Sequence, residues 1–206
     1  MRVLPFGDAA LLVEVDGLPE VLALTAAVRD AQPAGVVDVV PAAQTVLVVV
    51  EPGTSLAQLE RSLAELSTTA LSGSVAAPEG ETVDIPVIYD GPDLAEVARL
   101  TGLGEDEVVA AHTGTPWRIA FGGFAPGFAY LTDGDTRLTV PRRDEPRTAV
   151  PTGSVGLAGE YSGVYPRSSP GGWQLIGRSD AVLWDAERDP PALLTPGGFV
   201  RFTVAS

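Results

Sequence analysis

The sequence predicts an α+β protein in which a small αβ sandwich is followed by a small β-barrel. Three observations lead to this fold class. Helical and strand-like apolar patterns alternate before residue 67, and short apolar stretches separated by glycine and proline fill the chain after residue 117. Between these regions, Ser67–Gly80 is small and polar, which is typical of a linker or an exposed loop. We therefore expect two domains, residues 1–80 and 81–206.

The first domain opens with a predicted strand and a predicted helix. Ala10–Val15 is an apolar run of strand length. Pro19–Ala31 has the spacing of a helix with one apolar face. The residues expected on that face are Leu18, Val21, Leu22, Thr25 and Val28.

A hairpin and a second helix complete the first domain. Val36–Val40 and Thr45–Val50 are rich in β-branched residues and are joined by the turn Pro41–Gln44, so we expect them to pair. Thr54 or Ser55 can cap the following helix. The leucines that recur at helical spacing in it are Leu56, Leu59, Leu63 and Leu66.

The second domain begins with a strand and two short helices and continues as strands. Thr82–Tyr89 alternates, and its Pro86 suits an edge position. One short helix is predicted at Leu94–Leu100, and another starts at residues 104–106 and ends near Gly114. From Trp117 onward short strands and tight turns indicate a small barrel, and the last strand is expected at Phe199–Val204.

Composition excludes several kinds of chemistry. The chain has no cysteine, and all thirteen basic residues are arginines, so thiolate nucleophiles, cysteine metal sites, Schiff-base lysines and the P-loop lysine are excluded. A single histidine, His112, leaves no multi-histidine metal site, and we expect no metal. We find no pattern of a signal peptide and no apolar run long enough to span a bilayer, so a cytoplasmic protein is expected.

Charge is distributed unevenly along the chain. Residues 1–110 contain four arginines and eighteen carboxylates, whereas residues 111–206 contain nine of each. The net charge of −14 argues against nucleic acid or an anionic membrane surface as a partner. The arginines of the second half are therefore the candidates to meet a small anion.

Four consecutive motifs resemble a known family. They are EVVAAHTGTPWRIAFGGF at 107–124, GFAPGFAYL at 123–131, PRRDEPRTAVPTGSVGLAG at 141–159 and YSGVYPRSSPGGWQLIGR at 161–178. Together they resemble the B-subunit family of bacterial 5-oxoprolinase, which is also described as the sporulation kinase-A inhibitor family and as allophanate hydrolase subunit 1. The resemblance spans roughly residues 82 to 206.

The resemblance implies both a fold and a function. The barrel would be cyclophilin-like, without the prolyl isomerase activity of cyclophilins, because fold and function separate readily. The chain would be a non-autonomous subunit of an ATP-dependent enzyme that opens 5-oxoproline (pyroglutamate) to glutamate. It would pair with the C subunit of that enzyme and work with its A subunit, with ATP bound by the assembled complex. Two alternatives remain open, an inhibitor of a sensor histidine kinase and a carboxyltransferase-type subunit of a urea carboxylase or allophanate hydrolase system.

The run FGGFAPGFAYL is the first candidate for a substrate site. Phe124, Phe128 and Tyr130 could wall a flat lactam ring, while backbone N–H groups near Gly123 and Gly127 bind its carbonyl group. The alternative is a hairpin turn that packs its own rings.

Two arginines and a serine are further candidates. Arg142 and Arg147 could grip a carboxylate, because a guanidinium offers a planar fork that matches it. Local ion pairs with Asp144 and Glu145 are the alternative. Ser154 is expected to bind substrate by a hydrogen bond rather than to act as a nucleophile, since the surrounding residues do not form a nucleophile elbow.

Tyr165 and His112 complete the predicted site. Tyr165 would supply another aromatic edge, or it would simply belong to strands joined by a turn. His112 is the natural candidate for proton transfer, because its unperturbed pKa lies near neutrality. A histidine in the last turn of a helix is also a common capping residue, and the sequence leaves both roles open.

Overall fold

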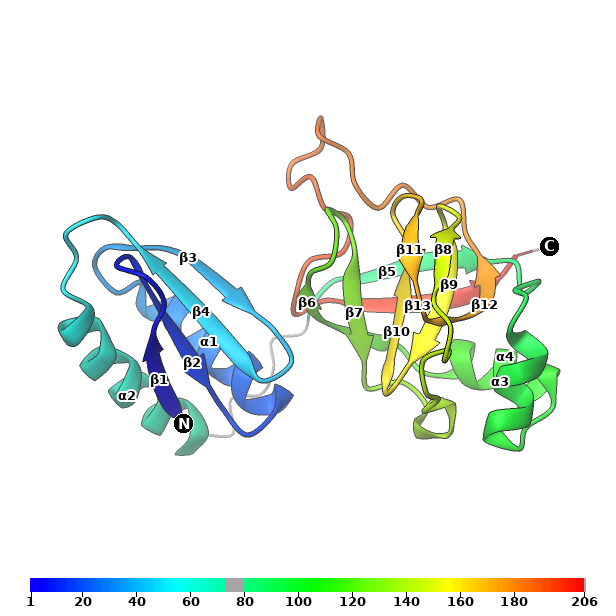
Figure 1. The fold of residues 1–206 in the computed structure, drawn as a ribbon, viewed down its shortest axis with the longest axis horizontal. Coiled ribbons are helices and arrows are strands. Elements are labelled where there is room, and N and C mark those ends of the chain that lie inside the picture. Colours follow the sequence, from blue (N-terminus) through cyan, green and yellow to red (C-terminus); the bar gives the residue numbers. More distant parts are fainter. Residues whose placement is uncertain (73–79, 206) are drawn as a thin grey trace. The chain divides into compact units, whose positions relative to one another are not determined.

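The computed structural model describes residues 1–72 and 80–205, and the chain divides into two compact units (Figure 1). Unit 1 comprises Met1–Pro78, and unit 2 comprises Glu79–Ser206. Each unit has a hydrophobic core of its own.

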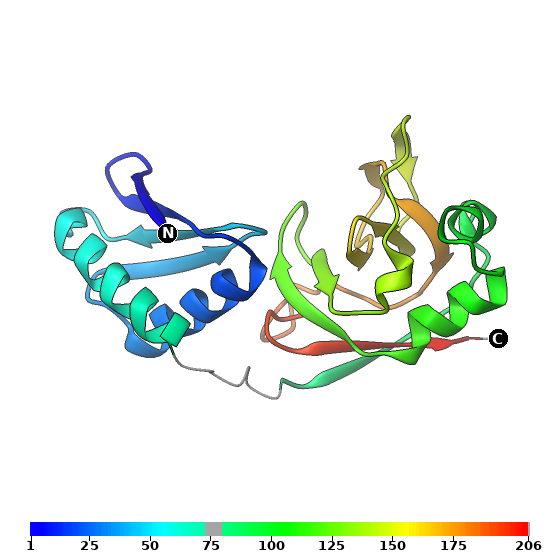
Figure 2. The same ribbon diagram turned by 90° about the horizontal axis from the view of Figure 1, so that it is seen from below.

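Unit 1 is a four-stranded antiparallel sheet with two helices on one face (Figure 2). The strand order is β1-β2-β4-β3. The elements are β1 (Arg2–Pro5), β2 (Ala10–Glu14), α1 (Leu18–Ala31), β3 (Val36–Pro41), β4 (Thr45–Val50) and α2 (Leu56–Ser72). This arrangement confirms the predicted αβ sandwich and the hairpin of β3 and β4, and it adds the strand β1, which the sequence pattern did not predict.

Residues at the ends of the unit 1 helices are of types that favour helix starts and ends. Pro19 lies in the first turn of α1, where its missing N–H costs nothing, and Gln32 ends the helix in a left-handed conformation. The Ser55 hydroxyl group accepts a hydrogen bond from the Gln58 N–H at 3.4 Å, as expected for a cap of α2. The buried residues of α1 include the predicted Val21, Thr25 and Val28. Leu24, which was not predicted, is buried too, whereas the predicted Leu18 and Leu22 are half-buried.

The predicted linker at Ser67–Gly80 begins too early. Helix α2 continues to Ser72, and Ser67 is buried in it. The Thr68 hydroxyl group donates a hydrogen bond to the Ala64 carbonyl group at 2.9 Å, so this polar side chain is satisfied within the helix. The rest of the predicted linker, residues 73–79, lies outside the described residues.

Unit 2 is a nearly closed β-barrel. Its seven-stranded sheet has the order β12-β9-β10-β7-β6-β13-β5. The elements are β5 (Thr82–Val87), α3 (Leu94–Thr101), α4 (Glu105–Gly114), β6 (Trp117–Gly122), β7 (Ala129–Thr132), a 3₁₀ turn (Thr136–Leu138), β8 (Arg147–Val150), β9 (Ser154–Ala158), β10 (Tyr161–Val164), β11 (Ser169–Gly171), β12 (Gln174–Arg178) and β13 (Phe199–Val204). Strands β8 and β11 form a separate two-stranded ribbon.

Two pairings close the barrel. Strand β13 lies between β6 and β5 and runs parallel to β5, with Phe199 opposite Thr82 and Val204 opposite Val87. Beyond β5, Ile88 forms a bridge to Arg178 at the end of β12 through two backbone hydrogen bonds of 2.9 Å. In the strand order β5 is the last strand, which agrees with the edge position predicted from Pro86. The bridge to β12 is made only after this strand, at Ile88.

Helices α3 and α4 pack against the barrel, and their apolar residues join its core. Val97 of α3 and Val108 of α4 are fully buried in the same cluster as Ile85, Leu157 and Phe202 of the strands. The short helices and the many short strands match the predicted second domain. The packing of α3 also fixes its first residues against strand β12, where the polar site described below is built.

Candidate functional site

The run FGGFAPGFAYL forms the hairpin of β6 and β7. Within its turn, the Gly123 N–H donates to the Phe128 carbonyl group at 3.2 Å, and the Phe128 N–H donates to the Ala125 carbonyl group at 2.9 Å. The Gly123 N–H is therefore already bonded within the turn. Gly127 has φ +83°, and a Cβ atom there would lie 2.8 Å from Cβ of Trp184, so no larger residue fits without a shift.

The predicted aromatic residues gather in one place. We define the aromatic cluster as Phe121, Phe124, Phe128, Tyr130, Tyr161, Tyr165 and Trp173. Most of its ring pairs meet edge to face, for example Phe128 and Trp173 with centroids 5.4 Å apart. Phe121 and Tyr130 are stacked at 4.6 Å. The hairpin thus packs its own rings, as one of the two interpretations predicts. It also packs against Tyr161 of β10, Tyr165 just after β10 and Trp173 just before β12.

Most of the aromatic cluster is internal, and one ring is exposed. Phe128, Tyr165 and Trp173 are buried, whereas the side chain of Phe124 is 56% exposed. Phe124 also has a left-handed backbone, φ +63°, which is uncommon for a residue other than glycine. A Cβ atom at Gly163 would lie 2.9 Å from the ring of Phe128, so the absence of a side chain there lets the rings lie against the backbone. The exposed ring that the cluster offers to a ligand is therefore that of Phe124.

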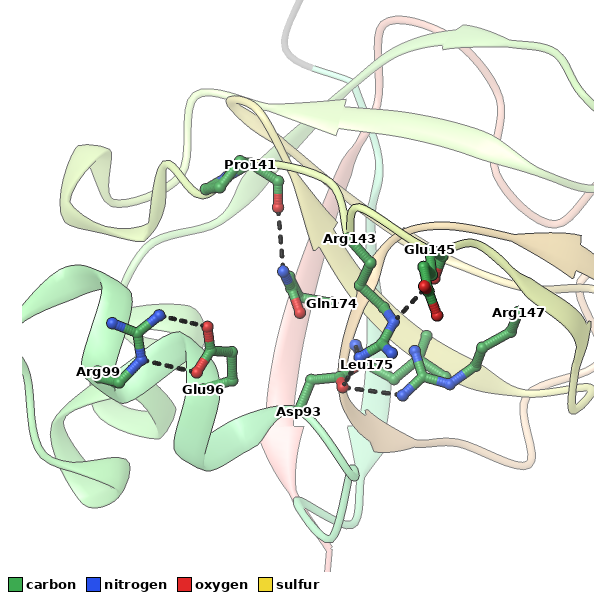
Figure 3. A network of polar contacts seen from close by, with 9 residues as sticks. All are labelled: Asp93, Glu96, Arg99, Pro141, Arg143, Glu145, Arg147, Gln174 and Leu175. Atoms are coloured by element: carbon green, nitrogen blue, oxygen red, sulfur yellow. Dashed lines mark hydrogen bonds and ion pairs between the residues drawn. The ribbon is translucent and has the colours of Figure 1, made fainter.

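The ribbon of β8 and β11 brings two arginines to the start of helix α3. Arg147 lies opposite Gly171 in this ribbon, and the Arg143 N–H donates to the Gly172 carbonyl group at 2.8 Å. Both guanidinium groups reach the carboxylate of Asp93, which precedes α3 (Figure 3). These residues are about 50 positions apart in sequence, and sequence reasoning missed both Asp93 and Arg143 as site residues.

Asp93 is the buried centre of this cluster. Arg143 Nη1 and Arg147 Nη2 each donate to its Oδ1 atom at 2.8 Å, and the Leu175 N–H donates to Oδ2 at 2.7 Å. Burial alone would raise the pKa of Asp93. The hydrogen bonds from Arg147 and the Leu175 amide group, with the charges of Arg147 and Arg143, outweigh burial and hold this pKa below its ordinary value. Asp93 is therefore ionised near neutral pH.

Two buried polar atoms next to Asp93 have no partner among the described residues. One is Nη1 of Arg147, and the other is Oε1 of Gln174. The amide nitrogen of Gln174 donates to the Pro141 carbonyl group at 3.2 Å. Thr25 Oγ1 and Arg188 Nη1 are also buried without a partner in the described residues, so this property is not specific to the surroundings of Asp93.

The other predicted binding residues lie around the same ribbon. Arg147 pairs with Asp93 rather than with its neighbours Asp144 and Glu145. Arg142 is exposed, and its positive charge reaches the Tyr165 hydroxyl group. Ser154 is buried in β9, and its carbonyl group accepts the Tyr165 N–H at 2.9 Å. Binding of substrate by these side chains stays a prediction.

His112 lies elsewhere, in the core of the barrel. Its side chain is fully buried; its Nδ1 is 2.7 Å from the Tyr89 hydroxyl group, and its Nε2 is 2.8 Å from the Ser162 hydroxyl group. The ring stacks on Phe202 with centroids 4.2 Å apart. Burial lowers the pKa of His112 to about 3 and raises the pKa of Tyr89, so both are neutral at physiological pH.

This geometry gives His112 a structural role. A neutral imidazole donates at one nitrogen and accepts at the other, so Tyr89 and Ser162 satisfy both. The His112 carbonyl group, near the end of α4, accepts the indole N–H of Trp117 at 3.0 Å. The side chain therefore lies inward rather than at an exposed helix end, and it stands apart from the Asp93 cluster in its contacts. Its proposed role in proton transfer stays a prediction.

Three further observations concern a metal site, a surface hollow and a membrane span. Within residues 1–72 and 80–205, no group of three or more histidines or carboxylates could hold a metal ion. Unit 1 carries a hollow of about 400 Å³, which none of the predicted site residues line. Its lining residues are Met1, Arg2, Glu14, Val15, Asp16, Gln44 and Thr45. No helix in the described part of the chain is long and apolar enough to cross a membrane.

The fold and the sequence together define the class of protein. The family described as carboxyltransferase domain, subdomain C and D, matches residues 1–194, and the chain belongs to this family. Among curated relatives it resembles the B subunit of 5-oxoprolinase from Escherichia coli O157:H7, with 51% identity over 128 residues, 61% of this chain and 59% of the relative. The protein of the same name from Bacillus subtilis is 46% identical over 123 residues, 58% of this chain and 51% of the relative. The matched segment thus covers about half to three fifths of these relatives.

Two solved structures resemble this chain in fold. The crystal structure of TTHA0988 is 36% identical, with a TM-score of 0.79, and the match covers 96% of this chain and 40% of that one. The urea carboxylase of Kluyveromyces lactis matches 99% of this chain and 22% of its own length with a TM-score of 0.73. Its identity is 18%, so this second likeness shows the fold alone.

Proposed function

We propose that this chain acts in the cytoplasm as the B subunit of an ATP-dependent 5-oxoprolinase complex that opens 5-oxoproline to glutamate. The observation that carries this proposal is the 51% identity to the 5-oxoprolinase B subunit of Escherichia coli O157:H7. A protein with that name belongs to an assembly, and we propose the C subunit as the direct partner and the A subunit as the third component.

The chain would contribute part of a shared substrate site. Arg147 and Arg142 would bind the carboxylate of 5-oxoproline, and the exposed ring of Phe124 would lie against the flat lactam. Phe128, Tyr130 and Tyr165 would support that ring from behind through edge-to-face contacts. Ser154 and Gly127 would shape the neighbouring backbone. No proton transfer by this chain is needed for such a role.

ATP would be bound elsewhere in the complex. Opening an unstrained lactam is hard because amide resonance is lost, and coupling to ATP hydrolysis would supply the driving force. The chain has no lysine, which excludes a P-loop of its own. We therefore expect the nucleotide to bind to another subunit.

Reconstitution tests this function directly. The purified chain is combined with the A and C subunits encoded in the same genome, and glutamate and phosphate are measured with 5-oxoproline and ATP as substrates. We expect glutamate only when all three proteins are present, with ATP hydrolysed in step. Omitting each protein in turn is the control. Steady glutamate formation by this chain alone, or none from the full set, would contradict the proposal.

The same purified proteins separate the two other functions that the family resemblance implies. Turnover of a urea-derived substrate in place of 5-oxoproline would favour a carboxyltransferase-type subunit. Lowered autophosphorylation of a sensor histidine kinase, with no hydrolase activity in the full set, would favour an inhibitor. Neither outcome is expected.

A further inference from the structure

The sheet of unit 1 has one face that its own helices do not cover. Helices α1 and α2 lie on the other face, where Val13, Val46 and Val48 are fully buried in the core (Figure 2). Successive side chains of a strand point to opposite faces, so the neighbours of these residues point away from the helices. We define the open face as the apolar residues on this side, which are Leu4, Phe6, Leu12, Val40, Leu47 and Val49. None of these six belongs to the core cluster of unit 1.

The centre of the open face is an apolar row that crosses all four strands. Leu4 of β1 lies opposite Leu12 of β2, and Leu12 lies opposite Leu47 of β4. Leu47 in turn lies opposite Val40 of β3. The three leucines are half-buried beside one another, and the Val40 side chain at the edge is 42% exposed. Side chains in register on neighbouring strands touch, so these four form one continuous strip.

A second apolar row lies beside the first. The Phe6 N–H donates to the Ala10 carbonyl group at 2.9 Å, and Ala10 lies opposite Val49 of β4. The Phe6 side chain is 58% exposed. An antiparallel sheet with one face in water alternates apolar and polar residues, whereas a strand covered on both faces is a nearly continuous apolar run. Strand β4, with the sequence TVLVVV, is such a run, so the open face has the composition of a covered surface.

One end of the open face is acidic and hollowed. Arg2 and Glu14 lie opposite each other two residues from the leucine row, and their side chains form an ion pair of 2.6 Å. The hollow of about 400 Å³ lies at this end, and Asp16 also lines it. The Asp16 N–H donates to the carboxylate of Glu20 at 3.3 Å. Three carboxylates thus gather here with the one guanidinium group of Arg2, which favours a basic side chain from outside.

Charge and area select the kind of partner. Residues 1–72 contain three arginines and nine carboxylates, so two copies of unit 1 repel each other and a basic surface is attracted. Four strands about 4.8 Å apart and about five residues long give a face of roughly 300–400 Å². Two copies joined by this face alone would bury about 600–800 Å², less than the roughly 1,200 Å² of a stable interface. The open face therefore fits a different protein that also contacts the chain elsewhere.

We propose that the C subunit docks on the open face, with an apolar surface over the leucine row and an arginine or lysine side chain in the hollow beside Glu14 and Asp16. Under the proposed function the same subunit shares the substrate site of unit 2, so the open face adds to a larger interface. The identity of the partner rests on the proposed function. The chemistry of the docking surface rests on the leucine row, the hollow and the charge of unit 1.

Substitutions at the centre of the leucine row test the apolar contact. The full chain is titrated with the purified C subunit by isothermal titration calorimetry. Leu47→Lys should weaken binding at least about 10-fold, because central apolar residues carry most of the binding energy of an interface. Leu47→Thr, a residue type suited to strands, should weaken it about threefold. Val204→Lys, at an exposed apolar position of β13 in unit 2, is the control and should leave the Kd unchanged. Thermal melts show that each variant is folded.

A second pair of variants tests the acidic hollow. Asp16→Asn removes one charge and keeps the shape of the side chain, so it should weaken binding of the C subunit about two- to fivefold at low salt and less at high salt. Asp30→Asn makes the same change at the exposed end of α1, on the helical side of unit 1, and should leave the Kd unchanged. Equal effects of the two variants would contradict a specific contact in the hollow.

The outcomes separate this inference from the proposed function. Glutamate formation by the full set of subunits, with an unchanged affinity of both Leu47 variants for the C subunit, would overturn the inference and leave the function standing. An affinity that depends on Leu47, in a full set that makes no glutamate, would support the inference and contradict the function. Light scattering that shows a dimer of the chain alone, lost in Leu47→Lys while the C subunit still binds, would identify a second copy as the occupant and overturn the inference.

Discussion

Unit 2 contains two buried polar networks that differ in what they leave unsatisfied. Around His112, the hydroxyl groups of Tyr89 and Ser162 satisfy both ring nitrogens, and every group is neutral. Around Asp93, two guanidinium groups share one carboxylate, and Nη1 of Arg147 has no partner in the described residues. The first network satisfies both ring nitrogens with neutral partners, whereas the second is charged and leaves one guanidinium nitrogen without a partner in the described residues.

The comparison shows why a favourable pKa in the free amino acid is a weak guide to a site. His112 attracts attention because its ordinary pKa is near neutrality, but burial moves that pKa to about 3. Arg147 belongs to the other kind of network, because one of its buried guanidinium nitrogens has no partner among the described residues. Unsatisfied hydrogen-bonding capacity distinguishes the two networks better than the type of residue does.

The largest effect on stability is expected at the centre of the charged network. Asp93→Ala would leave two arginines and the Leu175 N–H without their shared acceptor, and it should lower the free energy of unfolding by about 3 kcal/mol. Urea unfolding followed by circular dichroism measures this change. Asp84→Ala is the matched control, because Asp84 pairs with Arg201 on the exposed surface and should change little. Equal effects of the two substitutions would contradict a central role for Asp93.

The neutral network around His112 should make the free energy of unfolding depend on pH. The pKa of His112 falls from about 6.5 in the unfolded chain to about 3 in the folded chain, so the unfolded state binds more protons between these values. The His112 contribution to stability is therefore complete above pH 6.5 and falls by about 1.4 kcal/mol per pH unit below it. His112→Gln should lack this slope, which urea unfolding at pH 7.0, 6.0 and 5.0 measures. If the free energy of unfolding of the variant and of the wild type changed with pH in parallel, the predicted contribution of His112 would be contradicted.

The same variant decides the catalytic prediction for His112. Loss of a general acid or base typically lowers turnover by about 10²- to 10⁴-fold. Because both ring nitrogens face the core, we expect a folded His112→Gln complex to keep its kcat within about threefold. A loss in the catalytic range, with assembly intact by size-exclusion chromatography, would support the predicted role of His112 in proton transfer.

The smallest effect is expected at the edge of the neutral network. Tyr89→Phe removes one hydrogen bond to His112 Nδ1 and keeps the ring, so it should cost about 1 kcal/mol of stability. Urea unfolding followed by circular dichroism measures this change. A loss as large as that of Asp93→Ala would contradict the smaller role of Tyr89.

Much of the fold could be predicted from local patterns. The β-branched run Thr45–Val50 and the helical spacing in Pro19–Ala31 each depend on neighbouring residues, and the structure places β4 and α1 there. The order of the strands in unit 2 could not be predicted in this way. Pairing between β5 and β13 joins residues 117 positions apart, such as Asp84 and Arg201, and no local pattern encodes it.

The candidate site was predictable only in part, for the same reason. The aromatic residues of one hairpin are close in sequence, so Phe124, Phe128 and Tyr130 could be grouped together. Tyr161 of β10 and Trp173, which precedes β12, join them only through tertiary packing. Asp93 lies just before a predicted helix, and no local pattern marks it as a site residue. Its arginine partners lie 50 and 54 residues away, so only the fold brings them to it.

The place of β13 in the barrel has a consequence for how the protein folds as it is synthesised. Strand β13 fills the gap between β5 and β6, although both of these neighbours are made long before it. Until residues 199–204 emerge, β5 and β6 each present an unpaired strand edge, which is a template for pairing with another chain. Contacts so distant in sequence also form slowly. We therefore expect a nascent or truncated chain without β13 to need protection from aggregation, while unit 1, whose sheet is built from residues 2–50, can fold earlier.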